Sequence, residues 1–194
     1  MLKSKRKHII NQMKTEFRAI SENEGLSRAM ICAMIAQLDV TVEELADVRC
    51  AISEAVTNAV VHAYRGAVSA DDTDDTGDVF DDSRNTVYIL TTIYDDRSVK
   101  IIIRDRGCGI PDIRRAMEPL YTTDTTGERS GMGFAIMQSF MDTVKVKSAH
   151  GRGTTVEMRK KFAVPVSAAS AVQEDGCVQA DAESVPEDGQ EDIA

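Results

Sequence analysis

The sequence predicts an α/β fold of two layers, in which helices cover one face of a mixed, mostly antiparallel β-sheet. Two β-branched runs, TVYILTTIY and SVKIIIR, stand on either side of Asp95, Asp96 and Arg97, and this short spacing is typical of a hairpin. Two further alternating segments, in DTVKVKSAHGRGTTVEMRKKF, meet at residues 150–153 and predict another pair of strands. Residues 41–62 carry apolar side chains at helical spacing, and such a helix needs a sheet or another helix to cover its stripe.

The other predicted elements fall between these segments. Residues 8–20 have apolar positions that fit either one face of a helix or a short strand. Residues 21–23 offer capping side chains for a helix over 25–38, and the capping-type TVEE starts the long helix. DIRRAM predicts a short helix and GMGFAIMQSFMD a longer one, with a loop over 119–129 between them. The stripe of the long helix consists of Leu45, Val48, Ile52, Val56, Ala59 and Val60.

Two acidic segments account for the formal net charge of −9 on this chain of 194 residues. Residues 68–85 hold seven acidic residues and one basic residue, and residues 165–194 hold eight acidic residues and no basic one. The remainder, with 22 basic and 17 acidic residues, suits an anionic ligand but lacks the basic stripe of a nucleic-acid-binding protein. We therefore expect one folded domain over 1–164, an acidic surface loop at 68–85 and a disordered tail over 165–194.

The sequence also bears on the compartment in which the protein works. No stretch reaches the roughly 18 consecutive apolar residues of a membrane-spanning helix, and no signal-like apolar run follows the basic start. The cysteines, at positions 32, 50, 108 and 177, form no CxxC pair and no zinc-type spacing with histidine. These features predict a soluble, cytoplasmic protein with reduced thiols.

Glu54 and Asn58 are the first candidate site residues. They stand four residues apart on the long helix, so both side chains point from the same side into one small volume. An amide oxygen can bind Mg²⁺, while a carboxylate can accept a proton from an attacking hydroxyl or order a metal-bound water. Taken alone, the two residues equally fit a solvated or capping pair on an exposed helix face.

A glycine-containing turn, RDRGCGIPD, follows the second strand of the predicted hairpin. Gly107 and Gly109 would let the backbone approach a flat ligand, and the carboxylate of Asp105 could accept from an amino group such as that of adenine. A tight turn without a ligand uses the same residue types.

A second pair of glycines, Gly131 and Gly133 in GERSGMGF, stands at the start of a helix. Free backbone N–H groups and the helix dipole attract phosphate there, and Arg129 adds a positive charge. The Walker loop, the dinucleotide fingerprint and the HRD and DFG motifs of protein kinases are all missing from the sequence.

In this order, E-x-x-x-N on a helix, D-x-G-x-G after a strand and G-x-G opening a helix resemble the N, G1 and G2 boxes of the GHKL superfamily of ATPases and kinases. SENEGLSRAMICAMIAQLDVTVEEL, SEAVTNAVVHAY, IRDRGCGIPD, EPLYTTD and ERSGMGFAIMQSFMD further resemble the anti-sigma F factors of spore-forming bacteria, over about residues 8–161. The resemblance implies the GHKL, or Bergerat, sandwich and its strand order.

The resemblance also implies a role for each motif residue. Glu54 would be the catalytic base, Asn58 the Mg²⁺ ligand and Asp105 the residue that reads adenine. The glycines at 107, 109, 131 and 133 would surround the nucleotide, and Thr154 in GRGTT would support its adenine end.

Two arginines complete the implied site. Arg129 would meet the γ-phosphate when residues 119–130 close as a lid, where it would stabilise charge on the transferred oxygens. Arg28 resembles a partner-contacting arginine of the family. The chain differs from the family pattern in having HAY for the usual HGY, a longer acidic loop and an acidic tail, and none of these removes a proposed catalytic residue.

The function implied is that of a homodimeric, ATP- and Mg²⁺-dependent protein-serine kinase that is also an anti-sigma factor. Its partners would be a sporulation sigma factor, which it inhibits, and an anti-anti-sigma protein, which it phosphorylates, with no direct contact to nucleic acid or membrane. Two alternatives stay open: a kinase regulator of a stress-response sigma factor, and a nucleotide-dependent sigma-binding module without phosphotransfer. A sensor histidine kinase fragment is disfavoured, because no helical hairpin with a phosphoacceptor motif precedes the domain.

Overall fold

The computed structural model describes residues 7–64, 85–118 and 131–164. The chain divides into two units, Met1–Ala163 and Val164–Ala194, and every element named below belongs to the first. Arg129, the expected tail and nearly all of the expected acidic loop lie outside the described residues. Among the helices of the described ranges, none has the length and apolar character needed to cross a membrane.

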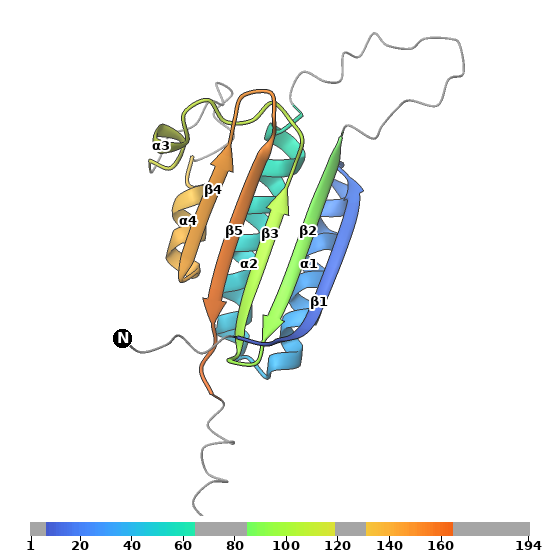
Figure 1. Ribbon diagram of the computed structural model, residues 1–194, viewed down its shortest axis with the longest axis vertical. Coiled ribbons are helices and arrows are strands. Elements are labelled where there is room, and N and C mark those ends of the chain that lie inside the picture. The colour runs from blue at the N-terminus through green and yellow to red at the C-terminus, as the bar shows by residue number, and fades with distance from the viewer. Residues whose placement is uncertain (1–6, 65–84, 119–130, 165–194) are drawn as a thin grey trace, which may run out of the picture. The chain divides into compact units, whose positions relative to one another are not determined.

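Strands and helices follow one another along the chain much as the sequence predicts (Figure 1). The strands are β1 (Ile9–Arg18), β2 (Thr86–Tyr94), β3 (Ser98–Arg104), β4 (Thr143–Ser148) and β5 (Thr154–Lys161). The helices are α1 (Glu22–Ile35), α2 (Val42–Thr57), α3 (Ile113–Ala116) and α4 (Gly133–Phe140). A 3₁₀ turn, η1 (Ala36–Leu38), follows α1, and a π-helical turn, η2 (Asn58–His62), follows α2.

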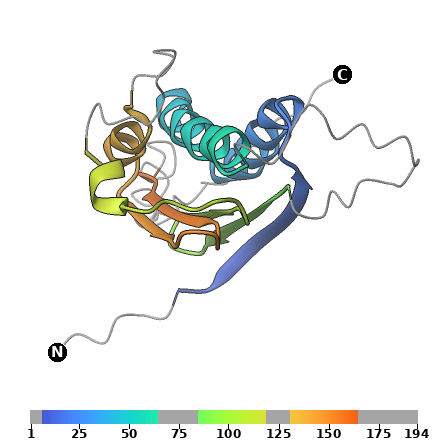
Figure 2. The same cartoon turned by 90° about the horizontal axis from the view of Figure 1, so that it is seen from above.

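The five strands form one sheet in the order β1-β2-β3-β5-β4. Each described pair of neighbours is antiparallel, and the β2–β3 and β4–β5 pairs are joined by short turns of the kind that antiparallel strands allow. Seen from above, α1, α2 and α4 lie together on one side of the sheet (Figure 2). The two-layer α/β fold predicted from the sequence is confirmed, although the described sheet is antiparallel at every pair and not mixed.

The segment over 8–20, which fitted either a helix or a strand, forms the edge strand β1. Met13 and Phe17 pack against the core, whereas Lys14 and Glu16 are exposed, so the side chains alternate between the two faces as they do in a strand. Much of β1 is exposed, which explains why its apolar pattern was too weak to decide between the two structures.

Helix α2 lies at the centre of the helical layer. The Thr41 hydroxyl accepts from the Glu44 N–H at 3.1 Å and the Glu44 carboxylate accepts from the Thr41 N–H at 3.0 Å, so the predicted capping box starts the helix. Val48, Ile52 and Val56 are completely buried against the sheet and its neighbouring helices. Truncating such a side chain to alanine typically costs about 2–5 kcal/mol, so this stripe holds α2 and its polar residues in place.

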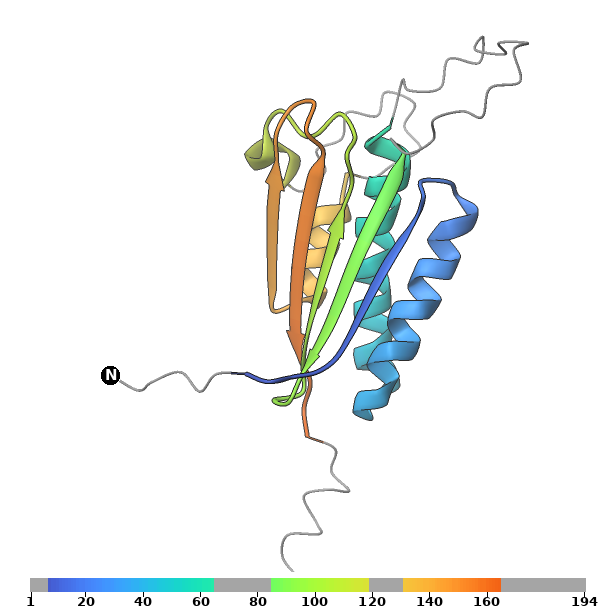
Figure 3. The same cartoon turned by 45° about the vertical axis from the view of Figure 1, so that its right-hand side comes forward.

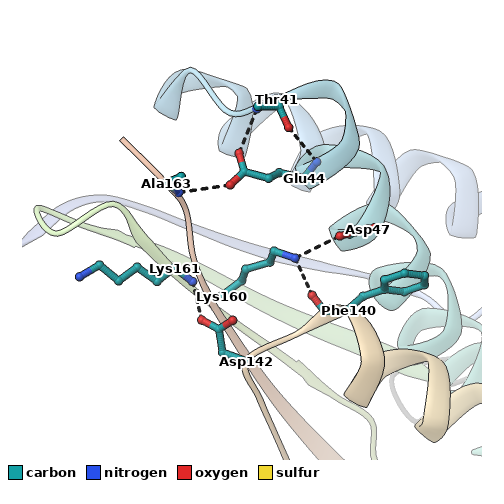
Figure 4. Close-up of polar contacts among 8 residues, drawn as sticks. All are labelled: Thr41, Glu44, Asp47, Phe140, Asp142, Lys160, Lys161 and Ala163. Atoms are coloured by element: carbon teal, nitrogen blue, oxygen red, sulfur yellow. Dashed lines mark hydrogen bonds and ion pairs between the residues drawn. The ribbon is translucent and has the colours of Figure 1, made fainter. Parts of the chain in front are cut away.

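The end of β5 is tied to the helices away from the predicted site (Figure 4). The Lys160 ammonium donates to the Phe140 carbonyl at the end of α4, at 2.8 Å, and lies 3.3 Å from the Asp47 carboxylate on α2. The Ala163 N–H donates to Glu44 at 3.2 Å. These contacts fix one end of α4, and the other end begins at the predicted phosphate-binding glycines.

Candidate functional site

A cavity of about 890 Å³ opens between the end of α2, the turn after β3 and the start of α4. Its volume falls in the range of small-molecule sites, which is roughly 300–1,000 Å³. It brings together most of the residues predicted from the sequence: Glu54, Asn58, Asp105, Gly109, Gly131, Gly133 and Thr154. Gly107 is not among the lining residues and packs on Ala63, Arg28 lies on α1, and Arg129 belongs to the residues that are not described.

Glu54 and Asn58 reach the cavity from the junction of α2 and η2. Glu54 stands in the last turn of α2, and Asn58 begins the π-helical turn, in which the Ala63 N–H donates to the Asn58 carbonyl at 3.3 Å. Both side chains are partly buried. Single π-helical turns within helices occur frequently at functional sites, and the sequence offers no periodic signal for them.

Gly133, the first residue of α4, lies against both of these side chains. A Cβ atom at this position would stand 2.9 Å from Glu54 Oε2 and 3.5 Å from Asn58 Nδ2. Only glycine therefore lets the start of α4 come this close without moving the carboxylate. The N-terminal end of a helix carries partial positive charge and free N–H groups, so an anionic ligand bound there would lie beside Glu54 and Asn58.

Asp105 follows β3 at another part of the cavity wall, and only 4% of its surface is exposed. Its Oδ1 accepts from the Gly107 N–H at 2.9 Å and from the Thr154 N–H at 3.0 Å. Because both bonds go to the same oxygen, Oδ2 remains an acceptor for a ligand group. Burial raises the pKa of the Asp105 carboxyl above its usual value, while the two N–H donors act in the opposite direction.

The glycines of the turn after β3 allow two close approaches of the backbone. A Cβ at Gly107 would lie 1.9 Å from the carbonyl oxygen of Ala63, so this glycine packs the turn onto η2. Gly109 has a φ of +73°, and a Cβ there would lie 2.1 Å from the Ala149 carbonyl oxygen. Ala63, one of the positions at which the sequence departs from the expected pattern, has a φ of −65° and so needs no glycine.

Three residues that support the turn after β3, although they do not line the cavity, were missed by sequence reasoning. Gly153 has a φ of +77°, and a Cβ there would lie 2.2 Å from the Asp105 carbonyl oxygen. Its position directly before the predicted site residue Thr154, in GRGTT, could have pointed to it. The Ser148 hydroxyl accepts from the Ile110 N–H at 2.7 Å and donates to the Gly153 carbonyl at 3.0 Å. Tyr64 bonds to the backbone beside Asp105. Neither hydroxyl had a signal in the sequence, because each joins segments far apart in the chain.

Helix α1, which carries Arg28, is joined to the site by one side-chain hydrogen bond. Helices α1 and α2 lie side by side (Figure 3), and the Thr57 hydroxyl donates to the Glu24 carboxylate at 2.6 Å. Thr57 lines the cavity directly before Asn58, and Glu24 stands one turn before Arg28. A shift at the end of α2 would therefore be transmitted to α1 through this hydrogen bond.

Comparison with known proteins agrees with this geometry. A family model described as a histidine kinase-like ATPase domain matches residues 17–160. The anti-sigma F factor of Clostridium acetobutylicum is 42% identical over 154 residues, which cover 79% of this chain and 96% of that protein. The anti-sigma F factor of Pasteuria penetrans is 44% identical over 152 residues, which cover 78% of this chain and 91% of that protein.

A solved structure supports the fold alone. The RsbU and RsbW domains of a Mycobacterium tuberculosis protein match with a TM-score of 0.53 and 19% identity, over 80% of this chain and 33% of that chain. Family membership rests instead on the family model and on the curated relatives. The chain belongs to the anti-sigma F factor family and contains a histidine kinase-like ATPase domain.

Proposed function

We propose that this protein binds ATP in the cavity, transfers the γ-phosphoryl group to a serine of an anti-anti-sigma protein, and inhibits a sporulation sigma factor. The observation that carries the proposal is the position of the Glu54 carboxylate, which lies against the start of α4 at Gly133, while Asp105 lines the same cavity. A nucleotide fits this arrangement because it has an amino group on its base and anionic phosphates at its other end.

The described residues divide the binding of ATP between them. Asp105 Oδ2 accepts from the adenine amino group, and Thr154 supports that end through its N–H bond to Oδ1. The phosphates lie at the backbone N–H groups around Gly131 and Gly133. Asn58 offers an amide oxygen to Mg²⁺, which supplies positive charge opposite the phosphate oxygens.

In the transfer step, Glu54 acts as the general base. Its carboxylate takes the proton from the serine hydroxyl, and the serine oxygen forms a bond to the γ-phosphorus as the bond to the β–γ bridging oxygen breaks. ADP leaves with the electron pair of that bond. Arg129, outside the described residues, is proposed to stabilise the charge on the transferred oxygens.

Binding of the sigma factor is proposed for a homodimer and includes Arg28. The Thr57–Glu24 hydrogen bond supports a dependence on nucleotide, because it joins the helix of Arg28 to the residue before Asn58. Two features of β1 support self-association: it lies at an edge of the sheet, and 56% of Ile9 and 60% of Ile10 are exposed.

Two neighbouring functions compete with this proposal. Regulation of a stress-response sigma factor is disfavoured, since the curated relatives at 41–44% identity are named anti-sigma F factors. A sigma-binding module without phosphotransfer is disfavoured by Glu54, because a purely binding site has no need of a base against the phosphate-binding helix.

The experiment incubates the purified chain with γ-labelled ATP and a candidate anti-anti-sigma protein, and measures label on serine and retention of a sporulation sigma factor. Wild type should transfer label and retain the sigma factor only with nucleotide. Glu43→Gln, which alters an exposed carboxylate on the same helix, is the matched control for Glu54→Gln. Nucleotide-dependent retention without transfer would support the binding module, and no nucleotide binding would refute the proposal.

A further inference from the structure

The Tyr64 hydroxyl joins three parts of the site. It accepts from the Thr86 N–H at 3.1 Å and from the Arg106 N–H at 3.0 Å, and it donates to the Thr86 carbonyl at 2.7 Å. A phenol has one proton and two acceptor positions, so all of its capacity is used. Burial raises the pKa of Tyr64, which keeps the proton on the oxygen at neutral pH.

Two hydrogen bonds hold the turn after β3 against the residues that follow η2. The Arg106 N–H is held by Tyr64, and the Cys108 N–H donates to the Ala63 carbonyl at 2.7 Å. The residue between them, Gly107, donates to the Asp105 carboxylate at 2.9 Å. The position of the carboxylate therefore depends on a turn whose two flanking amides are fixed by consecutive residues, 63 and 64.

The other side of Asp105 is fixed by β5. The Asp105 N–H donates to the Thr154 carbonyl, and the Thr154 N–H donates to Asp105 Oδ1, both at 3.0 Å. These two bonds hold the residue in the sheet, whereas the direction of its carboxylate also depends on the Gly107 N–H and hence on the turn. The Tyr64 hydroxyl bonds to the backbone of Thr86 and Arg106, so its hydrogen bonds act on the carboxylate through the turn.

We propose that Tyr64 is a positioning residue for base selectivity, holding the turn so that the Asp105 carboxylate prefers a purine with a 6-amino group to one with a 6-oxo group. The inference rests on the proposed binding of ATP and adds to it a residue that determines specificity. A correctly placed carboxylate accepts from an amino group and repels a carbonyl, and specific hydrogen bonding of this kind discriminates strongly between analogues. A displaced carboxylate loses the attraction and the repulsion together.

The test compares ATP with ITP, in which oxygen replaces the amino group at C6 and N1 carries a hydrogen. Tyr64→Phe keeps the ring and removes the hydroxyl. We expect the dissociation constant for ATP to rise about tenfold and that for ITP to fall, because the attraction and the repulsion are both lost. The kcat with ATP should stay within about twofold, because the displacement is local to Asp105. Tyr94→Phe, at the far end of β2, is the matched control and should match wild type.

A double-mutant cycle separates positioning from general loosening of the fold. If Tyr64 acts through Asp105, adding Tyr64→Phe to Asp105→Asn should leave the ratio of ITP to ATP dissociation constants unchanged. The proposal would be overturned if Tyr64→Phe lowered the ratio of ITP to ATP dissociation constants as much in Asp105→Asn as in wild type. It would also be overturned if the single variant Tyr64→Phe kept the wild-type ratio. Absence of ATP binding by the wild-type chain would instead refute the proposed function.

A measurement on the wild-type protein covers the case in which Tyr64→Phe does not fold. The Arg106 amide hydrogen should exchange slowly with solvent, and more slowly still when ATP binds than when ITP binds. Fast exchange, or equal protection by the two nucleotides, would count against the proposal.

Discussion

The Glu54 carboxylate occupies the space in which a side chain at Gly133 would begin, since a Cβ there would lie 2.9 Å from Glu54 Oε2. The proposed base on α2 and the proposed phosphate-binding end of α4 thus form one packed unit. The atom in the way belongs to the end of a flexible side chain, so a methyl group at residue 133 would displace the carboxylate before it displaced the backbone.

Gly133→Ala should therefore lower activity much more than stability. We expect phosphotransfer to fall by at least about tenfold because the carboxylate moves away from the substrate hydroxyl. The free energy of unfolding should change by no more than about 1 kcal/mol, since alanine is well tolerated in helices. Denaturant unfolding and the labelled-ATP assay measure the two effects, and unchanged phosphotransfer would show that Glu54 does not need its present position.

Gly107→Ala, in contrast, should strongly lower the free energy of unfolding. Its Cβ would lie 1.9 Å from the Ala63 carbonyl oxygen, a backbone atom that cannot turn aside, and the Cys108 N–H bond to the same oxygen would also suffer. We expect a loss of more than about 2 kcal/mol in the free energy of unfolding, measured by urea denaturation. A variant as stable as wild type would contradict the packing role of Gly107.

Glu54→Gln tests the base directly. The amide keeps the size of the side chain but cannot take the serine proton, so phosphotransfer should fall by about 10²–10⁴-fold. ATP affinity should stay within about threefold, because Glu54 is proposed to act on the hydroxyl and not to hold the nucleotide. Single-turnover transfer and calorimetric titration measure these quantities, and normal transfer would exclude Glu54 as the base.

Periodic patterns in the sequence were enough for the elements of the fold, whereas the candidate site residues came from short motifs and from the family resemblance. The capping box at Thr41, the stripe on α2 and the β2–β3 hairpin depend on neighbours in the chain, so they could be predicted. The packing of Gly107 on Ala63 and the bonds of Tyr64 depend on segments that meet only after folding. For that reason the packing of Gly107 on Ala63 was not predicted, and Tyr64 was missed.

Lys160→Met should lower stability, because the Lys160 ammonium joins the end of α4 to α2 and its side chain is only 14% exposed. Methionine keeps the apolar stem and leaves the Phe140 carbonyl without this donor, at an expected cost of about 1–2 kcal/mol in the free energy of unfolding. Lys161→Met is the matched control, since Lys161 uses its backbone N–H to contact Asp142 and should change stability by less than about 0.5 kcal/mol. Equal effects of the two substitutions would mean that the Lys160 contacts contribute nothing.

Asp105→Asn should separate nucleotide binding from stability. The amide oxygen can still accept from the Gly107 and Thr154 N–H groups, but the NH₂ group then takes the place of Oδ2 and meets the adenine amino group as a second donor. We expect ATP affinity to fall by at least about tenfold.

The pH dependence of the Asp105 carboxyl gives this variant a second readout. Burial raises its pKa in the folded state, so the folded protein holds the proton more tightly than the unfolded chain does. Ionised Asp105 therefore lowers stability at pH values above its raised pKa, and this penalty shrinks as the pH falls from the raised pKa of the folded state to the ordinary pKa of the unfolded chain. Asp105→Asn removes the penalty, so its free energy of unfolding at about pH 7 should equal or exceed that of wild type.

Protonation of Asp105 at lower pH should stabilise the fold, but it should weaken the binding of ATP. Over an assay range from about pH 7.5 to about pH 5, the ATP affinity of wild type should fall more steeply than that of Asp105→Asn. Protonation of the Asp105 carboxyl removes its charge in wild type, whereas titration of the nucleotide phosphates affects both proteins alike. Calorimetric titrations at several pH values, with Glu43→Gln as a control that alters an exposed carboxylate away from the cavity lining, measure the difference. A wild-type affinity that stayed constant over the range would mean that an ionised Asp105 is not needed to bind the nucleotide.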